Sequence, residues 1–99
     1  MAKSKALKRR LQGRRRYVAF ALKEKMNLNA LTQEIKKQVS HDAQLRMIYD
    51  KYDHKKKRGI VLVSHKKAHE LIHVLHGMGI ETLGTSGILK KAYERYIAQ

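Results

Sequence analysis

The stretch Gly59-Ile60-Val61-Leu62-Val63-Ser64 is a continuous apolar run, mostly β-branched, with the length of a strand. A strand with one exposed face alternates apolar and polar residues, and this run does not alternate. We therefore expect both of its faces to be covered. Strands covered on both faces are usually parallel ones. The run predicts a parallel strand in a sheet with helices on both sides.

The residues after this strand predict a further helix, strand and helix. His65 to His76 has helical periodicity and ends at Gly77-Met78-Gly79, and Ile80 to Leu83 is a second strand candidate. Gly84-Thr85-Ser86-Gly87 is typical of a turn whose hydroxyl residues can cap a last helix over 88–98. We therefore expect a short parallel β-α-β unit with a right-handed crossover, followed by a C-terminal helix.

The residues before the strand have helical spacing. The apolar positions between Arg14 and Met26 predict a first helix over about 14–26. A second stripe follows a possible N-cap at Asn27 or Asn29, and a third follows Ser40. The second stripe comprises Leu28, Leu31, Ile35 and Val39, and the third comprises Leu45, Ile48, Tyr49 and Tyr52. These stripes predict two further helices, or one kinked helix. The fold class expected is α/β, a small single domain.

The charge points to a polyanionic partner. The chain has 99 residues, with 23 Lys plus Arg, 8 Asp plus Glu and a formal net charge of +15. A net charge of this size destabilises a compact state by self-repulsion unless a polyanion neutralises it. It also exceeds, by about twofold, what a small domain needs to stay in solution. Nucleic acid is therefore the partner we expect.

The composition also restricts the compartment. The chain has no cysteine, which excludes disulfides and thiolate metal sites, so an oxidising compartment is not implied. No apolar run approaches the roughly 20 residues of a membrane span, and the N-terminus lacks the apolar core of a secretory signal. We expect a cytoplasmic protein without a membrane partner. An Arg-rich, acid-poor start is also typical of transit peptides, and that alternative stays open.

The basic residues form two clusters. Residues 1–16 hold few large apolar groups, so we expect a basic RNA-binding arm over 1–16, disordered alone, before a module over 17–99. Four adjacent cations at 55–58 predict a loop that faces phosphates. An arm joined to a small module favours folded RNA over DNA. The residues expected to contact RNA are Lys3, Lys5, Lys8, Arg9, Arg10, Arg14, Arg15, Arg16, Tyr17, Lys55, Lys56, Lys57, Arg58, Lys66 and Lys67.

Four histidines lie on one side of the helix expected over 65–76, namely His65, His69, His73 and His76. Two imidazoles at i and i+4 can bind zinc, but the outer two are separated by about 11 Å along a helix axis, so the four cannot converge on one ion. We favour contacts with phosphates and bases, and we expect neither a metal nor a cofactor. The acidic residues are scattered over different expected elements. We therefore expect no catalytic residues and no small-molecule substrate.

Over its whole length the chain resembles small ribosomal proteins. The resemblance rests on the start Met-Ala-Lys-Ser-Lys-Ala-Leu-Lys-Arg-Arg, on Arg14-Arg15-Arg16 beside Tyr17, and on Lys55 to Arg58 before a strand. The chain looks most like the additional, lineage-specific proteins of archaeal ribosomes. This resemblance implies a structural protein of the ribosome that binds and neutralises rRNA beside neighbouring ribosomal proteins, without catalysis.

Residues 60–97 also resemble the C-terminal half of PIN-type nucleases, through Ile60-Val61-Leu62-Val63, Gly79-Ile80 and Leu83-Gly84-Thr85-Ser86-Gly87-Ile88-Leu89. That family implies metal-dependent RNA cleavage by clustered acids. Here Ser64 and His65 stand where such acids are expected, so the resemblance implies a strand-helix-strand-helix shape without the active site. Two alternatives remain at this point, a PIN-like RNA nuclease or its inactive relative, and a basic DNA-binding nucleoid protein that uses residues 28–52 as a helical unit.

Overall fold

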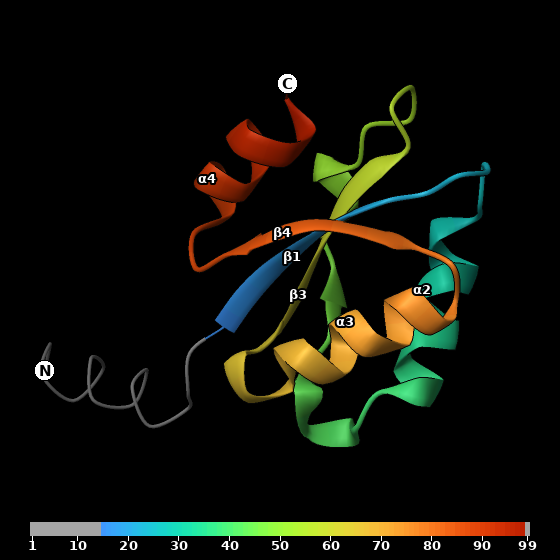
Figure 1. Ribbon diagram of the computed structural model, residues 1–99, viewed down its shortest axis with the longest axis vertical. Helices are drawn as coiled ribbons and strands as arrows, with labels where there is room; N and C mark the ends of the chain where they lie inside the picture. The colour runs from blue at the N-terminus through green and yellow to red at the C-terminus, as the bar shows by residue number, and fades with distance from the viewer. Residues whose placement is uncertain (1–14, 99) are drawn as a thin grey trace, which may run out of the picture.

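The sheet is built around the strand β1, Arg15–Ala21. In this computed structural model, which describes residues 15–98, β1 pairs antiparallel with β3, Arg58–Ser64, on one side and with β4, Glu81–Ser86, on the other (Figure 1). The two-residue strand β2, Arg46–Met47, pairs antiparallel with the free edge of β3. The strand order is therefore β2-β3-β1-β4.

Helices cover both faces of the sheet. The helices α2, Leu28–Gln38, and α3, Ala68–Gly77, pack on one face, and α4, Leu89–Ala92, lies on the other (Figure 1). The last helix continues from α4 into a π-helical turn over Tyr93–Ile97. Short 3-10 turns occupy His41–Ala43, Tyr49–Lys51 and His65–Lys67. None of the helices in this described part is long and apolar enough to cross a membrane.

The core lies in two layers because residues alternate between the faces of β1 and β3. On one face, β1 and β3 pack against the helices α2 and α3. The strand residues of this layer are Val18, Phe20, Val61 and Val63, and the helix residues include Leu31, Ile35, Leu71 and Leu75. Ala19 and Ile60 face the last helix and pack on Ala92 and Ile97. The middle of β1 is therefore buried from both sides, with Val18, Ala19 and Phe20 all at 0% exposure.

Several expectations from the sequence are confirmed. The run 59–64 is a strand buried on both faces, and residues 28–38 form a helix that begins at Asn27, whose side chain accepts from the backbone N–H groups of Asn29 and Ala30. Residues 65–76 are helical, first as a 3-10 turn and then as α3. The mixed helix and sheet class is also confirmed.

The helix expected over 14–26 is wrong, because this segment contains β1. Aromatic and β-branched residues favour strands, and a strand buried on both faces shows a continuous apolar run that periodicity alone cannot separate from a buried helix. Arg15 and Arg16 therefore belong to the sheet, and the expected arm boundary at residue 16 falls inside a strand. Residues 1–14 lie outside the described part of the chain.

The parallel β-α-β unit is also wrong, since the sheet is antiparallel. The strands β3 and β4 are joined through α3, but β1 lies between them and pairs with each. The sequence of elements over 60–97 is strand, helix, strand and helix, yet the two strands share no hydrogen bonds. The strand β1 occupies the position between β3 and β4, and the sequence pattern over 60–97 gives no sign of this.

The helix expected from the third stripe and the turn expected at 84–87 are also wrong. Instead of a helix, residues 40–52 form two 3-10 turns around β2, in which Leu45 and Met47 alternate with exposed Arg46. Gly84, Thr85 and Ser86 belong to β4, which carries a bulge at Leu83 opposite Ala19 and Phe20. No side chain caps α4, although the Ser86 Oγ accepts from the backbone N–H of Ile88 at 3.2 Å.

Gly84 lets the last helix lie against the sheet. Its partner across β1 is Ala19, and a Cβ at position 84 would overlap the ring of Tyr96. Tyr96 packs with the cluster of Ala19, Ile60, Ala92 and Ile97. The small residue therefore sets the distance between β4 and this helix.

We expect Gly84→Val to lower the free energy of unfolding by about 1–3 kcal/mol, because the added methyl groups must displace Tyr96. Thermal unfolding monitored by circular dichroism measures this. The control is Gly77→Ala at the end of α3, where an added Cβ meets nothing within 4 Å. Equal melting temperatures for the wild type and Gly84→Val would contradict this account.

Candidate nucleic-acid interface

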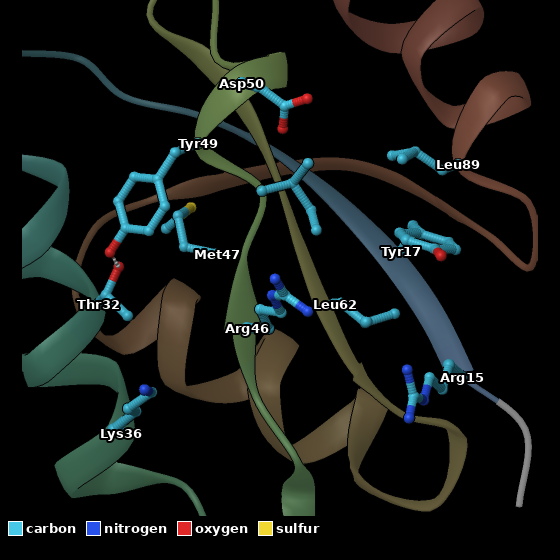
Figure 2. A pocket seen from close by; sticks show the side chains of 11 residues that line it. Arg15, Tyr17, Thr32, Lys36, Arg46, Met47, Tyr49, Asp50, Leu62 and Leu89 are labelled. Atoms are coloured by element: carbon cyan, nitrogen blue, oxygen red, sulfur yellow. Dashed lines mark hydrogen bonds between the residues drawn. The ribbon is translucent and has the colours of Figure 1, made fainter.

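A hollow of about 580 Å³ extends from α2, around the edge strand β2, onto the part of the sheet face that the last helix leaves open. It reaches from α2 across β2 and β3 to β1 and the start of α4 (Figure 2). The lining residues are Arg15, Tyr17, Thr32, Lys36, Arg46, Met47, Ile48, Tyr49, Asp50, Leu62 and Leu89. The hollow thus combines an apolar and aromatic floor with charged side chains.

The strand register explains the floor. Arg46 of β2 is opposite Leu62 of β3, Leu62 is opposite Tyr17 of β1, and Tyr17 is opposite Ser86 of β4. These four residues form one row across the sheet, on the face that carries the last helix. The next row contains Ile60, Ala19 and Gly84 and is covered by that helix. The row through Tyr17 is only partly covered, since Leu62 is buried while Tyr17 is half-buried at the edge of the cluster beneath that helix.

Three cationic side chains from three elements surround the hollow. Arg15 comes from β1, Lys36 from α2 and Arg46 from β2, and all three residues are exposed (Figure 2). Within residues 15–98, no carboxylate forms an ion pair with any of them. Asp50 is the one acidic residue in the lining. The hollow has an excess of positive charge and is suited to an anion.

The far wall of the hollow is held by a hydrogen bond. The Tyr49 hydroxyl lies 3.3 Å from the Thr32 Oγ1 and donates to it, and the Thr32 hydroxyl donates to the Leu28 carbonyl at 2.7 Å (Figure 2). Thr32 is buried, whereas Tyr49 is 49% exposed. This link joins the 3-10 turn after β2 to α2, so the wall does not depend on β2 alone.

The basic turn at 55–58 lies at the other end of the sheet from Arg15. Ala21 is opposite Arg58 and Arg15 is opposite Ser64, so the two basic regions are separated by the length of β3, roughly 20 Å. Asp53 shapes the turn, because its Oδ1 accepts from the backbone N–H groups of Lys55 at 2.9 Å and Lys56 at 3.0 Å. The backbone hydrogen bond from Lys56 lowers the pKa of the Asp53 carboxyl.

Two of the cations in this turn bind the last helix. The Lys56 ammonium donates to the Ile97 carbonyl at 3.1 Å, and the Arg58 guanidinium donates to the Tyr96 carbonyl at 3.3 Å. Carbonyls at a helix C-terminus lack helical partners and carry partial negative charge, so cations stabilise them. The sequence pattern does not predict these hydrogen bonds from the turn to the last helix, because the two segments lie about forty residues apart.

Lys66 and Lys67 differ in their surroundings. Lys66 is exposed in the middle of the 3-10 turn after β3. Lys67 lies 3.7 Å from the Asp42 carboxylate and 3.9 Å from that of Glu70. Glu70 also accepts from the backbone N–H and the hydroxyl of Ser40. Lys67 is therefore part of a link between α3 and the segment after α2, and it is less available to phosphates than Lys66.

The histidines and acids do not assemble a metal site in the described part of the chain. His65, His69, His73 and His76 are all exposed, and the His76 Nε2 lies 3.0 Å from the Thr82 hydroxyl. Within residues 15–98 no three His, Cys, Asp or Glu side chains lie where they could hold one ion. Residues 28–52 contain one α-helix, two 3-10 turns and β2, so they do not form the helical DNA-binding unit that the nucleoid-protein alternative requires.

The structure brings only part of the expected RNA-binding set together. Arg15 and Tyr17 meet at the hollow, while the turn over 55–58 is at the opposite end of the sheet, and Arg16 points to the other face beside Val63. The remaining six expected residues, Lys3, Lys5, Lys8, Arg9, Arg10 and Arg14, lie outside the described part of the chain.

Sequence reasoning missed Lys36 and Arg46. The alternation of Leu45, Arg46 and Met47 was the available signal for β2, since an exposed cation between two more buried residues has strand periodicity. Lys36 gave no signal, because only the position of α2 beside β2 brings it to the hollow.

We expect Arg58→Gln to loosen the end of the last helix and to cost about 1 kcal/mol of stability, because a charged donor to the Tyr96 carbonyl is lost. Hydrogen exchange of the amides from Ala92 to Ala98 should become faster. Lys55→Gln is the control, since the structure of residues 15–98 shows no hydrogen bond or ion pair of the Lys55 ammonium. Equal exchange in both variants would contradict the role of Arg58.

The lowered pKa of Asp53 predicts a pH-dependent contribution to stability. Its carboxylate is favoured in the folded state, so the contribution is present above the ordinary pKa of 3.8 and is lost as the pH falls through the lowered folded value. Asp53→Asn keeps the acceptor oxygen but removes the charge. We expect the wild type to melt at a higher temperature than Asp53→Asn at pH 7, with the difference shrinking below pH 3.8. A difference that stays constant down to pH 2 would contradict this.

Comparison of the sequence with protein-family models and with curated proteins gave no match. The candidate interface is therefore described from the residues of this chain alone. Its defining features are the partly covered row through Tyr17 and Leu62 and the cations Arg15, Lys36 and Arg46 around it.

Proposed function

We propose that this protein is a structural RNA-binding component of a ribonucleoprotein, and that the ribosome is the particle in which it resides. It binds folded RNA through cationic side chains, neutralises phosphates and performs no catalysis. The observation that carries this proposal is the hollow on the open sheet face, where three cations from separate elements have no carboxylate partner within residues 15–98.

The charge of the chain supports a polyanion of considerable length. The net charge is +15, and cations lie at both ends of the sheet, with Arg15 and Lys66 at one end and Lys55 at the other. A small anion can neutralise one of these regions but not both, given roughly 20 Å between them. A nucleic acid backbone carries phosphates at short, regular intervals and can reach each region in turn.

Folded RNA is favoured over duplex DNA by the shape of the surface. The described residues offer no protruding recognition helix, because α2 and α3 pack with the sheet and the last helix lies on its other face. Sequence-specific contact with duplex DNA usually needs such a helix or a two-stranded ribbon in the major groove. A hollow edged by cations suits the irregular surface of folded RNA.

Sedimentation of the tagged full-length chain from native lysate, at low and at high salt, tests this proposal. We expect it to migrate with one ribosomal subunit, to remain there after a high-salt wash, and to move to the top of the gradient after ribonuclease treatment. A chain that lacks residues 1–14 is the matched variant. It keeps β1 but loses six cations, so we expect it to leave the particle at lower salt.

Slow sedimentation of the full-length chain at both salt concentrations would overturn the proposal. Migration with a particle that is resistant to ribonuclease would overturn it too, because the attachment would then not depend on RNA.

A further inference from the structure

We propose that the hollow on the open sheet face binds an unpaired nucleotide of RNA, with its base stacked against Tyr17 and its phosphates held by Arg15, Arg46 and Lys36. This inference rests on the proposed RNA-binding function and names the RNA element that the site takes. A site that stacks a base distinguishes single-stranded loops, bulges and ends from paired regions, which phosphate contacts alone cannot do.

Tyr17 is placed to act as a stacking surface. It lies on the central strand, its neighbours Val18 and Ala19 are fully buried, and β3 and β4 hold its backbone from both sides. Its own side chain is only partly buried, at the edge of the cluster beneath the last helix. A rigid aromatic ring that is partly open to solvent offers a base a stacking partner at little entropic cost.

The residues beside Tyr17 suit the remaining parts of a nucleotide. Leu62, its partner on β3, continues the apolar floor toward Arg46, the partner of Leu62 on β2. Arg15 lies two residues before Tyr17 on the same face of β1. The two guanidinium groups therefore flank the Tyr17 and Leu62 floor from two strands, and Figure 2 shows Lys36 reaching toward the hollow from α2.

The size and polarity of the hollow favour one unpaired nucleotide over a duplex. A volume of about 580 Å³ gives room for a ligand the size of one nucleotide, since ligand pockets usually measure roughly 300–1,000 Å³. The start of the last helix at Leu89 and the wall at Tyr49 bound the floor on two sides. The bases of a duplex are stacked on one another and cannot reach such a floor, whereas unpaired bases can be splayed onto an aromatic ring. Asp50 can accept from a base amino group.

The test measures binding of the full chain to two fluorescent RNAs at physiological salt, a single-stranded uridine hexamer and a blunt RNA duplex. We expect Tyr17→Leu to weaken hexamer binding about tenfold or more and to leave duplex binding within twofold. Tyr17→Phe keeps an aromatic ring and is expected to keep hexamer affinity. Arg46→Gln is expected to weaken hexamer binding, and the matched control Arg95→Gln, on the outer side of the last helix, is not.

Photo-crosslinking of a 4-thiouridine hexamer gives a second readout that does not depend on substitutions. Trypsin cleaves after Arg16 and Lys23, so we expect the crosslinked base on the peptide of residues 17–23. Crosslinks confined to the turn over 55–58, or equal losses of hexamer and duplex binding in Tyr17→Leu, would overturn the stacking site while leaving RNA binding intact. Failure of the wild type to bind either RNA would overturn the proposed function as well.

Discussion

The position of β1 between β3 and β4 is the constraint on which the rest of the structure depends. It satisfies the backbone of β1 on both edges, and it places Val18 and Phe20 in one core layer and Ala19 in the other. Neither layer is complete without this strand. It also fixes the face that carries the candidate interface, because Tyr17 lies inside that face only when β1 lies inside the sheet. The fold and the candidate interface therefore share one determinant.

The last helix decides which part of the sheet face is open. It covers the row through Ala19 because Gly84 permits close approach, and its C-terminal carbonyls are bound by Lys56 and Arg58. Some of the positive charge in the chain is therefore used to complete the fold. Lys67, which pairs with Asp42, is a further example. Net charge alone overstates the number of side chains available to an external phosphate.

Local sequence patterns are sufficient to predict those elements whose apolar residues have a clear periodicity or form a clear run. The strand over 58–64 and the helices α2 and α3 have clear patterns and could be predicted. The strand β1 could not, because its residues from Tyr17 to Phe20 are apolar on both faces and periodicity does not distinguish this from a buried helix. The antiparallel pairing depends on contact between segments that lie far apart in the sequence, from Ala21 opposite Arg58 to Arg15 opposite Ser64. Of the candidate site, Arg15 and Tyr17 could be predicted from the sequence. Arg46 depends on the register of β2 against β3, and Lys36 depends on the position of α2 beside β2.

The arrangement separates two kinds of contact that the proposed RNA-binding function needs. Cations at the ends of the sheet, such as Lys55 and Lys66, offer contacts that any phosphate backbone satisfies and that salt weakens. The proposed contact at Tyr17 needs an exposed base, and stacking is much less sensitive to salt than phosphate contacts are. A protein with only the first kind would bind every RNA surface of sufficient charge. In the proposed function, the second kind of contact, carried by β1 between its two neighbouring strands, selects among those surfaces the one that presents an unpaired base.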